Sequence, residues 1–279
     1  MKIADRLELE DFLHKNNLKP SRALGQNFLV DSEVLAKIVA AGELKNSDEV
    51  VEIGAGLGAL TRELSTRVKK VSALEFDRNI FPALQENLKK YENVELKNID
   101  VRKFTLPSSD YKLVANIPYY LTSPILRKFF AESSNPPQLA VLLVQKEVAE
   151  KICEPKKLSV LALEVRIFAN PEIVAIVKPE SFLPPPKVDS AILKISLNKN
   201  PVIARADIPD FFKIAHAGFH SPRKKIRGSF ASGLPFPKEV AHEILEKAEV
   251  DSNLRAEDLA ISDWQKILTA FREFTKLHA

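Results

Sequence analysis

Apolar residues in the first half of the chain fall into short runs, separated by stretches in which they recur at helical spacing. The runs predict buried strands at 48–53, 71–74, 94–97, 111–115 and 139–145. The other stretches predict helices at 4–16, 32–41, 60–68, 80–89 and 123–131, with Asp31 or Ser32 as the cap of the second one. Strands and helices that alternate in this way are typical of an α/β fold with a doubly wound sheet of parallel strands.

The pattern changes near residue 173. Two further apolar runs, 173–177 and 190–197, predict strands on either side of a proline-dense loop. Residues 198–201 have the composition of a linker, and beyond them the spacing predicts only helices, at 208–217, 224–231, 238–247 and 261–276. We therefore predict an α/β domain in residues 1–200 and a small all-helical domain in residues 201–279.

The composition of the 279 residues is that of a globular protein, with 45% hydrophobic and 28% charged residues. No uninterrupted apolar stretch approaches the roughly 18 residues of a membrane span, and the amphipathic, acid-containing residues 1–17 do not resemble a targeting signal. The single cysteine, Cys153, excludes an internal disulfide and a multi-cysteine metal site. We expect a cytoplasmic monomer without a metal centre, and the net charge of +4 permits a nucleic-acid partner without requiring one.

Glycines and acidic residues stand where the first three predicted strands end. Gly54 and Gly56 follow the first strand, in a loop where glycine allows a tight turn and the close approach of a ligand to the backbone. Glu75 ends the second strand, where it is suited to accept from ribose hydroxyls, and Asp100 follows the third, where it is suited to accept from an adenine amine. The spacing predicts a nucleoside cofactor, and it is shared by dinucleotide oxidoreductases and S-adenosylmethionine enzymes.

The strand predicted at 111–115 opens into the segment Asn116–Tyr119. Because the residue before Pro118 is disfavoured in helix, the strand should end directly in a loop. An amide oxygen, backbone carbonyls and an aromatic ring at the carboxyl end of a strand are suited to hold a nucleobase by its exocyclic amine. The alternative is a strand that simply ends at a proline turn, with Tyr119 and Tyr120 packed in the core.

The segment Asn116–Tyr119 resembles the signature of methyltransferases that act on exocyclic amino groups of bases. From about residue 17 to residue 196 the chain resembles the small-subunit ribosomal RNA adenine dimethyltransferases, through Gly25–Leu29, Val51–Gly58, Leu74–Asp77 and Ser181–Ser190. The resemblance implies a Rossmann-like class I methyltransferase sheet followed by a helical C-terminal domain. It also implies S-adenosyl-L-methionine-dependent dimethylation of two adjacent adenosines in the 3′-terminal hairpin of small-subunit (16S) rRNA, with the assembling subunit as the partner.

The same resemblance implies roles for individual residues. The cofactor would be bound by residues from the N-terminal loop, the glycine loop and four strand ends: Asn27, Leu29, Gly54, Gly56, Glu75, Asp100 and Asn116. Asn116 and a backbone carbonyl of Pro118 or Ile117 would accept hydrogen bonds from the target amine. Tyr119 would stack on the flipped base and Phe182 would cover its other face, with Phe28 as a further aromatic candidate.

Basic residues near turns are the candidates for RNA phosphate contacts. They are Lys19 and Arg22 before the N-terminal loop, and the run Arg223, Lys224, Lys225 and Arg227 in the helical region. The alternative for the run is a solvated helix face.

Three other functions stay open at this point. A macrolide-resistance methyltransferase, which modifies an adenine of large-subunit rRNA, shares the catalytic motifs. A non-catalytic ribosome-assembly factor on the same fold would be expected to lack Asn116, Glu75 or the glycines, and all are present. A dinucleotide oxidoreductase would explain Gly54–Glu75 but would leave the Asn116–Tyr119 segment without a role.

Overall fold

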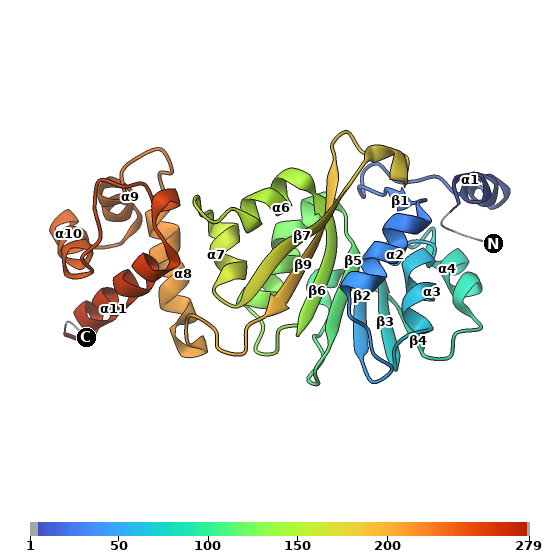
Figure 1. The fold of residues 1–279 in the computed structure, drawn as a ribbon, viewed down its shortest axis with the longest axis horizontal. Coiled ribbons are helices and arrows are strands. Elements are labelled where there is room, and N and C mark those ends of the chain that lie inside the picture. Colours follow the sequence, from blue (N-terminus) through green and yellow to red (C-terminus); the bar gives the residue numbers. More distant parts are fainter. Residues whose placement is uncertain (1–4, 278–279) are drawn as a thin grey trace. The chain divides into compact units, whose positions relative to one another are not determined.

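The computed structural model describes residues 5–277, which form two compact units (Figure 1). The first unit comprises the chain up to Glu150 together with Asn170–Leu197, and the second comprises Lys151–Ala169 together with the chain from Asn198 onward. The predicted boundary near residue 200 lies close to the junction at Leu197. The grouping of Lys151–Ala169 with the helical unit differs from the predicted division of the chain.

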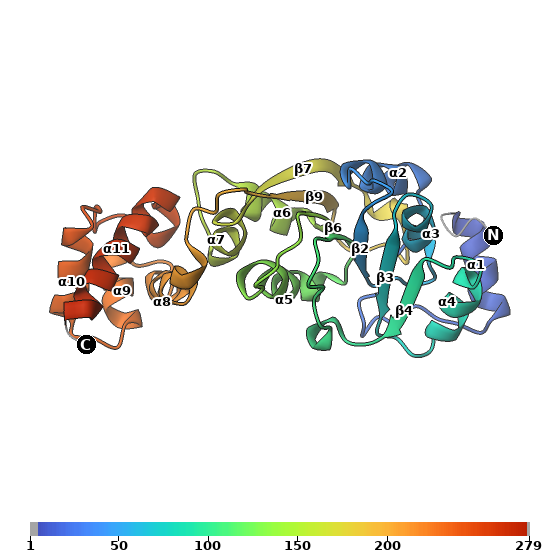
Figure 2. The same cartoon turned by 90° about the horizontal axis from the view of Figure 1, so that it is seen from below.

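The first unit is built on a seven-stranded sheet of order β4-β3-β2-β5-β6-β9-β7 (Figures 1 and 2). Its strands are β2 (Glu49–Ile53), β3 (Lys70–Glu75), β4 (Val94–Asn98), β5 (Lys112–Asn116), β6 (Leu139–Gln145), β7 (Ala169–Val177) and β9 (Ser190–Leu197). Strands β2 to β6 pair in parallel, and β9 pairs antiparallel with β6. The doubly wound parallel sheet is thus confirmed, and the antiparallel strand makes it a mixed sheet.

Every second residue of a strand points to the same face of this sheet, and apolar residues at these positions form its core. Val71 and Ala73 of β3, and Val141 and Leu143 of β6, are buried in one core cluster together with apolar residues of α2, α3 and α4. The helices of this part of the chain are α1 (Arg6–Lys15), α2 (Ser32–Ala41), α3 (Ala59–Ser65), α4 (Phe81–Leu88), α5 (Thr122–Leu126) and α6 (Lys146–Cys153). The two-residue period explains why short apolar runs with β-branched residues formed strands here.

Asp31 confirms the predicted start of α2. Its carboxylate accepts hydrogen bonds from the backbone N–H groups of Glu33 and Val34, at 3.0 and 3.1 Å, and one from the Ser181 hydroxyl at 2.7 Å. Asp31 therefore caps α2 and also binds the proline-rich loop, residues 181–190.

A second, two-stranded sheet joins distant parts of the chain. Strand β1 (Phe28–Leu29) pairs antiparallel with β8 (Phe182–Leu183), so that Leu29 lies opposite Phe182. Arg6 of α1 reinforces this link, because its guanidinium donates to the backbone carbonyls of Glu180 and Phe182 at 2.8 and 2.9 Å. The N-terminal loop and the proline-rich loop are held together by these contacts.

The second unit contains α7 (Val160–Arg166), α8 (Ile208–Gly218), α9 (Ile226–Gly233), α10 (Lys238–Lys247) and α11 (Ile261–Leu277). Trp264 of α11 is fully buried against Gly218 of α8, where an added Cβ would come within 2.3 Å of the indole ring. Backbone hydrogen bonds attach Lys151–Ala169 to this unit, from Leu158 N–H to the Glu257 carbonyl and from Asn198 N–H to the Phe168 carbonyl, both at 2.8 Å. None of the helices within residues 5–277 combines the length and apolarity needed to cross a membrane.

Candidate active site

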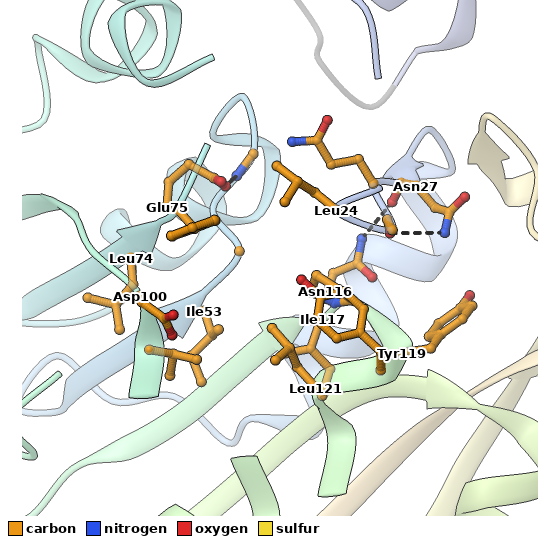
Figure 3. A pocket seen from close by; sticks show the side chains of 18 of the residues that line it. Leu24, Asn27, Ile53, Leu74, Glu75, Asp100, Asn116, Ile117, Tyr119 and Leu121 are labelled. Atoms are coloured by element: carbon orange, nitrogen blue, oxygen red, sulfur yellow. Dashed lines mark hydrogen bonds between the residues drawn. The ribbon is translucent and has the colours of Figure 1, made fainter. Parts of the chain in front are cut away.

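The carboxyl ends of β2, β3 and β5 open into a pocket of roughly 920 Å³, part of which is open to solvent (Figure 3). The chain leaves β2 toward β3 on one side and reaches β5 on the other, and in open α/β sheets ligands bind at such a switch point. Glu75 and Asp100 lie toward one end of the pocket, Tyr119 toward the other, and Asn116 between them (Figure 3). The structure thereby brings together most of the residues predicted to bind the cofactor or the target base.

The glycine loop forms part of the pocket wall. Gly54 and Gly56 both adopt positive φ, +73° and +61°, a conformation that L side chains rarely adopt. A Cβ at Gly54 would come within 3.1 Å of the Asn116 carbonyl oxygen, and one at Gly56 within 3.3 Å of the Phe28 ring. The absence of side chains here keeps the backbone open to the pocket.

Glu75 is held in place by the backbone. Its two carboxylate oxygens accept hydrogen bonds from the N–H groups of Asp77 and Gly56, each at 2.8 Å. Only 6% of the residue is exposed, and this burial raises the pKa of its carboxyl group above the ordinary value. These two hydrogen bonds fix the Glu75 carboxylate at the end of β3. Each of its oxygens keeps a lone pair that can accept a hydrogen bond from a ligand.

Asp100 begins the 3₁₀ turn Val101–Lys103 and is bound by Arg102. One carboxylate oxygen accepts from the Arg102 backbone N–H at 2.9 Å, and both accept from Nε at 3.0 Å. The second oxygen also accepts from Nη2 at 2.5 Å. The hydrogen bonds from the Arg102 side chain lower the pKa of Asp100, so this carboxylate is negatively charged at the end of β4.

Asn116 lies at the end of β5, where the chain turns at Pro118. Its Nδ2 donates to the Asn27 carbonyl at 3.1 Å, and the Asn27 side chain in turn donates to the Gly25 carbonyl at 3.3 Å (Figure 3). Because the bond uses the amide N–H of Asn116, it fixes the side chain and leaves Oδ1 as an acceptor for a ligand.

Tyr119 follows in a 3₁₀ turn and lines the pocket. Its hydroxyl and the Ser190 hydroxyl share a hydrogen bond of 2.6 Å, and burial raises the pKa of the phenol. Ser190 is the last residue of the proline-rich segment, so this bond ties the two sequence motifs together. The ring is thereby held at a fixed place in the pocket wall.

The side chains of two predicted site residues, Leu29 and Phe182, lie in the core. Neither lines the pocket; Leu29 is 6% exposed, and Phe182 is fully buried with it in the core cluster. The antiparallel pairing of β1 with β8 is the reason, because it directs both side chains into the core. The contact of Phe182 with a base and that of Leu29 with the cofactor therefore stay predictions.

The basic candidates lie on the surface. Lys19 and Arg22 are exposed just before the loop Leu24–Phe28, which lines the pocket, and Phe28 is among the lining residues. The run in the second unit, at the start of α9, is also exposed at each of its four basic positions, Arg223, Lys224, Lys225 and Arg227.

Several pocket residues were not predicted from the sequence. Phe76, between Glu75 and Asp77, is 55% exposed and lines the pocket, as do Arg102 and Tyr120. Gln26 closes one side, because its amide donates to Asp77 at 2.8 Å while its Oε1 accepts from the Ser21 N–H. An aromatic residue directly after a strand that ends in an acid was the available signal for Phe76.

The chain matches the family model described as ribosomal RNA adenine dimethylase over residues 17–273. It is 41% identical over 267 residues to the ribosomal RNA small subunit methyltransferase A of Dehalococcoides mccartyi strain CBDB1, a match that covers 93% of this chain and 91% of the relative. A dimethyladenosine transferase from Plasmodium falciparum superposes with a TM-score of 0.76 at 28% identity, over 88% of this chain and 97% of the other. The 23S rRNA methyltransferase ErmE gives a TM-score of 0.71 at 27% identity, over 88% and 100%.

Proposed function

Because the chain belongs to the ribosomal RNA adenine dimethylase family, we propose that it dimethylates the exocyclic amino groups of two adjacent adenosines in the 3′-terminal hairpin of small-subunit rRNA. S-adenosylmethionine is the methyl donor. The observation that carries the proposal is the position of Asn116, a fixed amide acceptor between the acidic end of the pocket and the Tyr119 ring.

The residues at the acidic end fit the nucleoside part of S-adenosylmethionine. Glu75 offers carboxylate acceptors for the ribose hydroxyls, and Asp100 offers an acceptor for the adenine amine. Gly54 and Gly56 leave room for the ligand against the backbone, and Asn27 lies beside Asn116 at the methionine end. When bound, the cofactor supplies an electrophilic methyl group on a positively charged sulfur.

The other end of the pocket activates the target amine. The lone pair of an adenine amine is delocalised into the ring, which makes the nitrogen a poor nucleophile. Hydrogen bonds from this amine to Asn116 Oδ1 and to a carbonyl of Ile117 or Pro118 favour a pyramidal nitrogen with a more localised lone pair. Tyr119 stacks on the base and offsets part of the cost of taking it out of the RNA stack.

Positioning provides much of the acceleration. The amine nitrogen forms a bond to the methyl carbon while the sulfur–carbon bond breaks, and the nitrogen becomes cationic. It then loses a proton readily to water, so no protein base is needed. The same arrangement serves a second round, in which the monomethyl amine presents its remaining N–H to Asn116.

The RNA itself is proposed to be held by basic residues of both units. Lys19 and Arg22 lie on the chain that leads into the pocket, and the α9 run offers four exposed cations for phosphates. We take the substrate to be the assembling small subunit, and the enzyme to act in the cytoplasm as a monomer.

The small subunit is favoured over the large one by the extent of the likeness. Relatives that are 35–41% identical over 93–95% of this chain are small-subunit rRNA methyltransferases. An assembly factor without activity has no need of the ordered Asn116 amide. A dinucleotide oxidoreductase leaves Asn116 and Tyr119 without a role.

The test is transfer of labelled methyl groups to unmethylated small subunits, with large subunits in parallel and nucleoside analysis by mass spectrometry. The proposal predicts dimethyladenosine in small-subunit RNA only. Label confined to the large subunit would assign the enzyme to the resistance type. Bound S-adenosylhomocysteine with no label in either subunit would favour the assembly factor.

A further inference from the structure

An exposed aromatic ring lies at the edge of the pocket, where the mechanism above makes no use of it. Tyr120 is 59% exposed, although it lines the same pocket as Tyr119. An aromatic side chain with this exposure gains little from the protein core, and its place in the pocket lining leaves the ring accessible to a ligand.

The ring is held on a rigid support. Tyr120 lies in the 3₁₀ turn that is closed by the hydrogen bond from Leu121 N–H to the Pro118 carbonyl at 2.9 Å and by that from Thr122 Oγ1 to the Tyr119 carbonyl at 3.0 Å. A Cβ built on Gly25 would lie 3.5 Å from the Tyr120 Cε1 atom, so one side of the ring is backed by the N-terminal loop. The turn and the loop together hold the ring still.

Arg102 lines the same pocket as Tyr120 and brings a cation to it. The Arg102 side chain is 69% exposed, and its salt bridge to Asp100 uses Nε and Nη2 and leaves Nη1 outside that pairing. Lys128 donates to the Arg102 carbonyl at 3.1 Å, so its ammonium group lies beside Arg102, and Lys103 is exposed on the same 3₁₀ turn as Arg102.

We propose that Tyr120 and Arg102 form a platform for the nucleotide next to the target adenosine: its base stacks on the Tyr120 ring and its phosphate lies against Arg102 and Lys128. A stacking ring with cations beside it is the usual way in which proteins hold unpaired RNA bases. Because Tyr120 directly follows Tyr119 in the chain, the two rings are placed to receive successive nucleotides. This inference rests on the proposed function and adds a binding position to it.

The test compares steady-state methyl transfer to unmethylated small subunits for four variants of the full chain. Tyr120→Ala removes the stacking ring, Tyr120→Phe keeps it, and Arg102→Gln removes the charge. Arg67→Gln is the matched control, because Arg67 is an exposed arginine ion-paired to Glu63 on α3 and does not line the pocket. Affinity for S-adenosylhomocysteine is measured for each variant by calorimetry.

Loss of one stacked base predicts a KM for small subunits about 10-fold higher in Tyr120→Ala, with kcat within about threefold of wild type. Tyr120→Phe should behave as wild type. In Arg102→Gln, the slope of log kcat/KM against log salt should fall by about 0.7, the amount expected for one phosphate contact to a single strand. Arg67→Gln should change neither.

Three outcomes would overturn the inference. An unchanged KM in Tyr120→Ala would show that no base stacks on this ring. An equal defect in Tyr120→Phe would assign the effect to the hydroxyl group. Loss of S-adenosylhomocysteine affinity in Tyr120→Ala with an unchanged KM for subunits would place the ring in the cofactor site. If the wild-type protein transfers no methyl group at all, it is the proposed function that fails, before the platform is put to the test.

Discussion

Glu52 lies in β2 directly before the glycine loop, and its replacement by glutamine should change how stability depends on pH. Only 1% of the residue is exposed, and its Oε2 has no hydrogen-bond partner among residues 5–277. Burial, and secondarily the negative charge of Glu75, raise its pKa to about 8, although the neighbouring Thr61 opposes part of the rise. Glu52 is therefore protonated in the folded protein at neutral pH.

The sign and size of the effect follow from this difference between the folded and unfolded states. An unfolded glutamate ionises near pH 4.5, so above that pH the folded state keeps a proton that the unfolded state has released. The free energy of unfolding then falls as pH rises from about 4.5 to about 8. At roughly 1.4 kcal/mol per pH unit, the upper limit of the loss is about 5 kcal/mol. Glutamine has the same size and does not titrate.

Urea unfolding at pH 5 to 9, followed by circular dichroism at constant ionic strength, measures this difference. The stability of Glu52→Gln relative to wild type should increase by several kcal/mol from pH 5 to pH 8. The control is Glu49→Gln, at the partly exposed start of the same strand, because hydrogen bonding to Lys69 lowers the pKa of Glu49 and confines its effect to acid pH. Parallel curves for Glu52→Gln and wild type between pH 5 and 9 would refute the reasoning.

Three further predictions follow from the packing and the surface charge. Gly56→Ala strains a residue at φ +61° and brings a Cβ within 3.3 Å of Phe28, so calorimetry should show S-adenosylhomocysteine binding weakened about 10-fold, from a strain of roughly 1–2 kcal/mol. Gly218→Ala forces a Cβ against Trp264 and should cost about 1–3 kcal/mol of stability in Trp264 fluorescence, whereas Gly228→Ala, with its nearest contact at 4.0 Å, should cost far less. Neutralising Arg223, Lys224, Lys225 and Arg227 together should lower the salt slope of small-subunit binding by up to about 3, and an unchanged slope would leave these residues as a solvated face.

Local patterns in the sequence were enough to predict most of the sheet and part of the site. The apolar run at 139–145 is β6 to the residue, and β5 ends at Asn116 in the pocket wall, as the proline two residues later indicated. These features depend on short stretches of chain, whose hydrophobic period and turn residues act locally.

The parts that the sequence did not predict depend on contacts between distant residues. The pairing of β1 with β8 joins residues about 150 positions apart, and it decides that Phe182 points into the core. The segment Lys151–Ala169 groups with the helical unit through backbone bonds to residues near 198 and 257, which no local pattern reveals. Arg102 and Tyr120 are 18 positions apart, and only the folded structure shows that the turn Val101–Lys103 and the turn Tyr119–Leu121 line the same pocket.

Single-turnover methyl transfer by Asn116→Ala to unmethylated small subunits measures whether Asn116 activates the target amine. The cofactor is supplied at saturation, and S-adenosylhomocysteine affinity is measured separately. Loss of a fixed acceptor in the transition state predicts a transfer rate about 10²–10³-fold lower at saturating cofactor. A transfer rate within a few-fold of wild type would contradict the account.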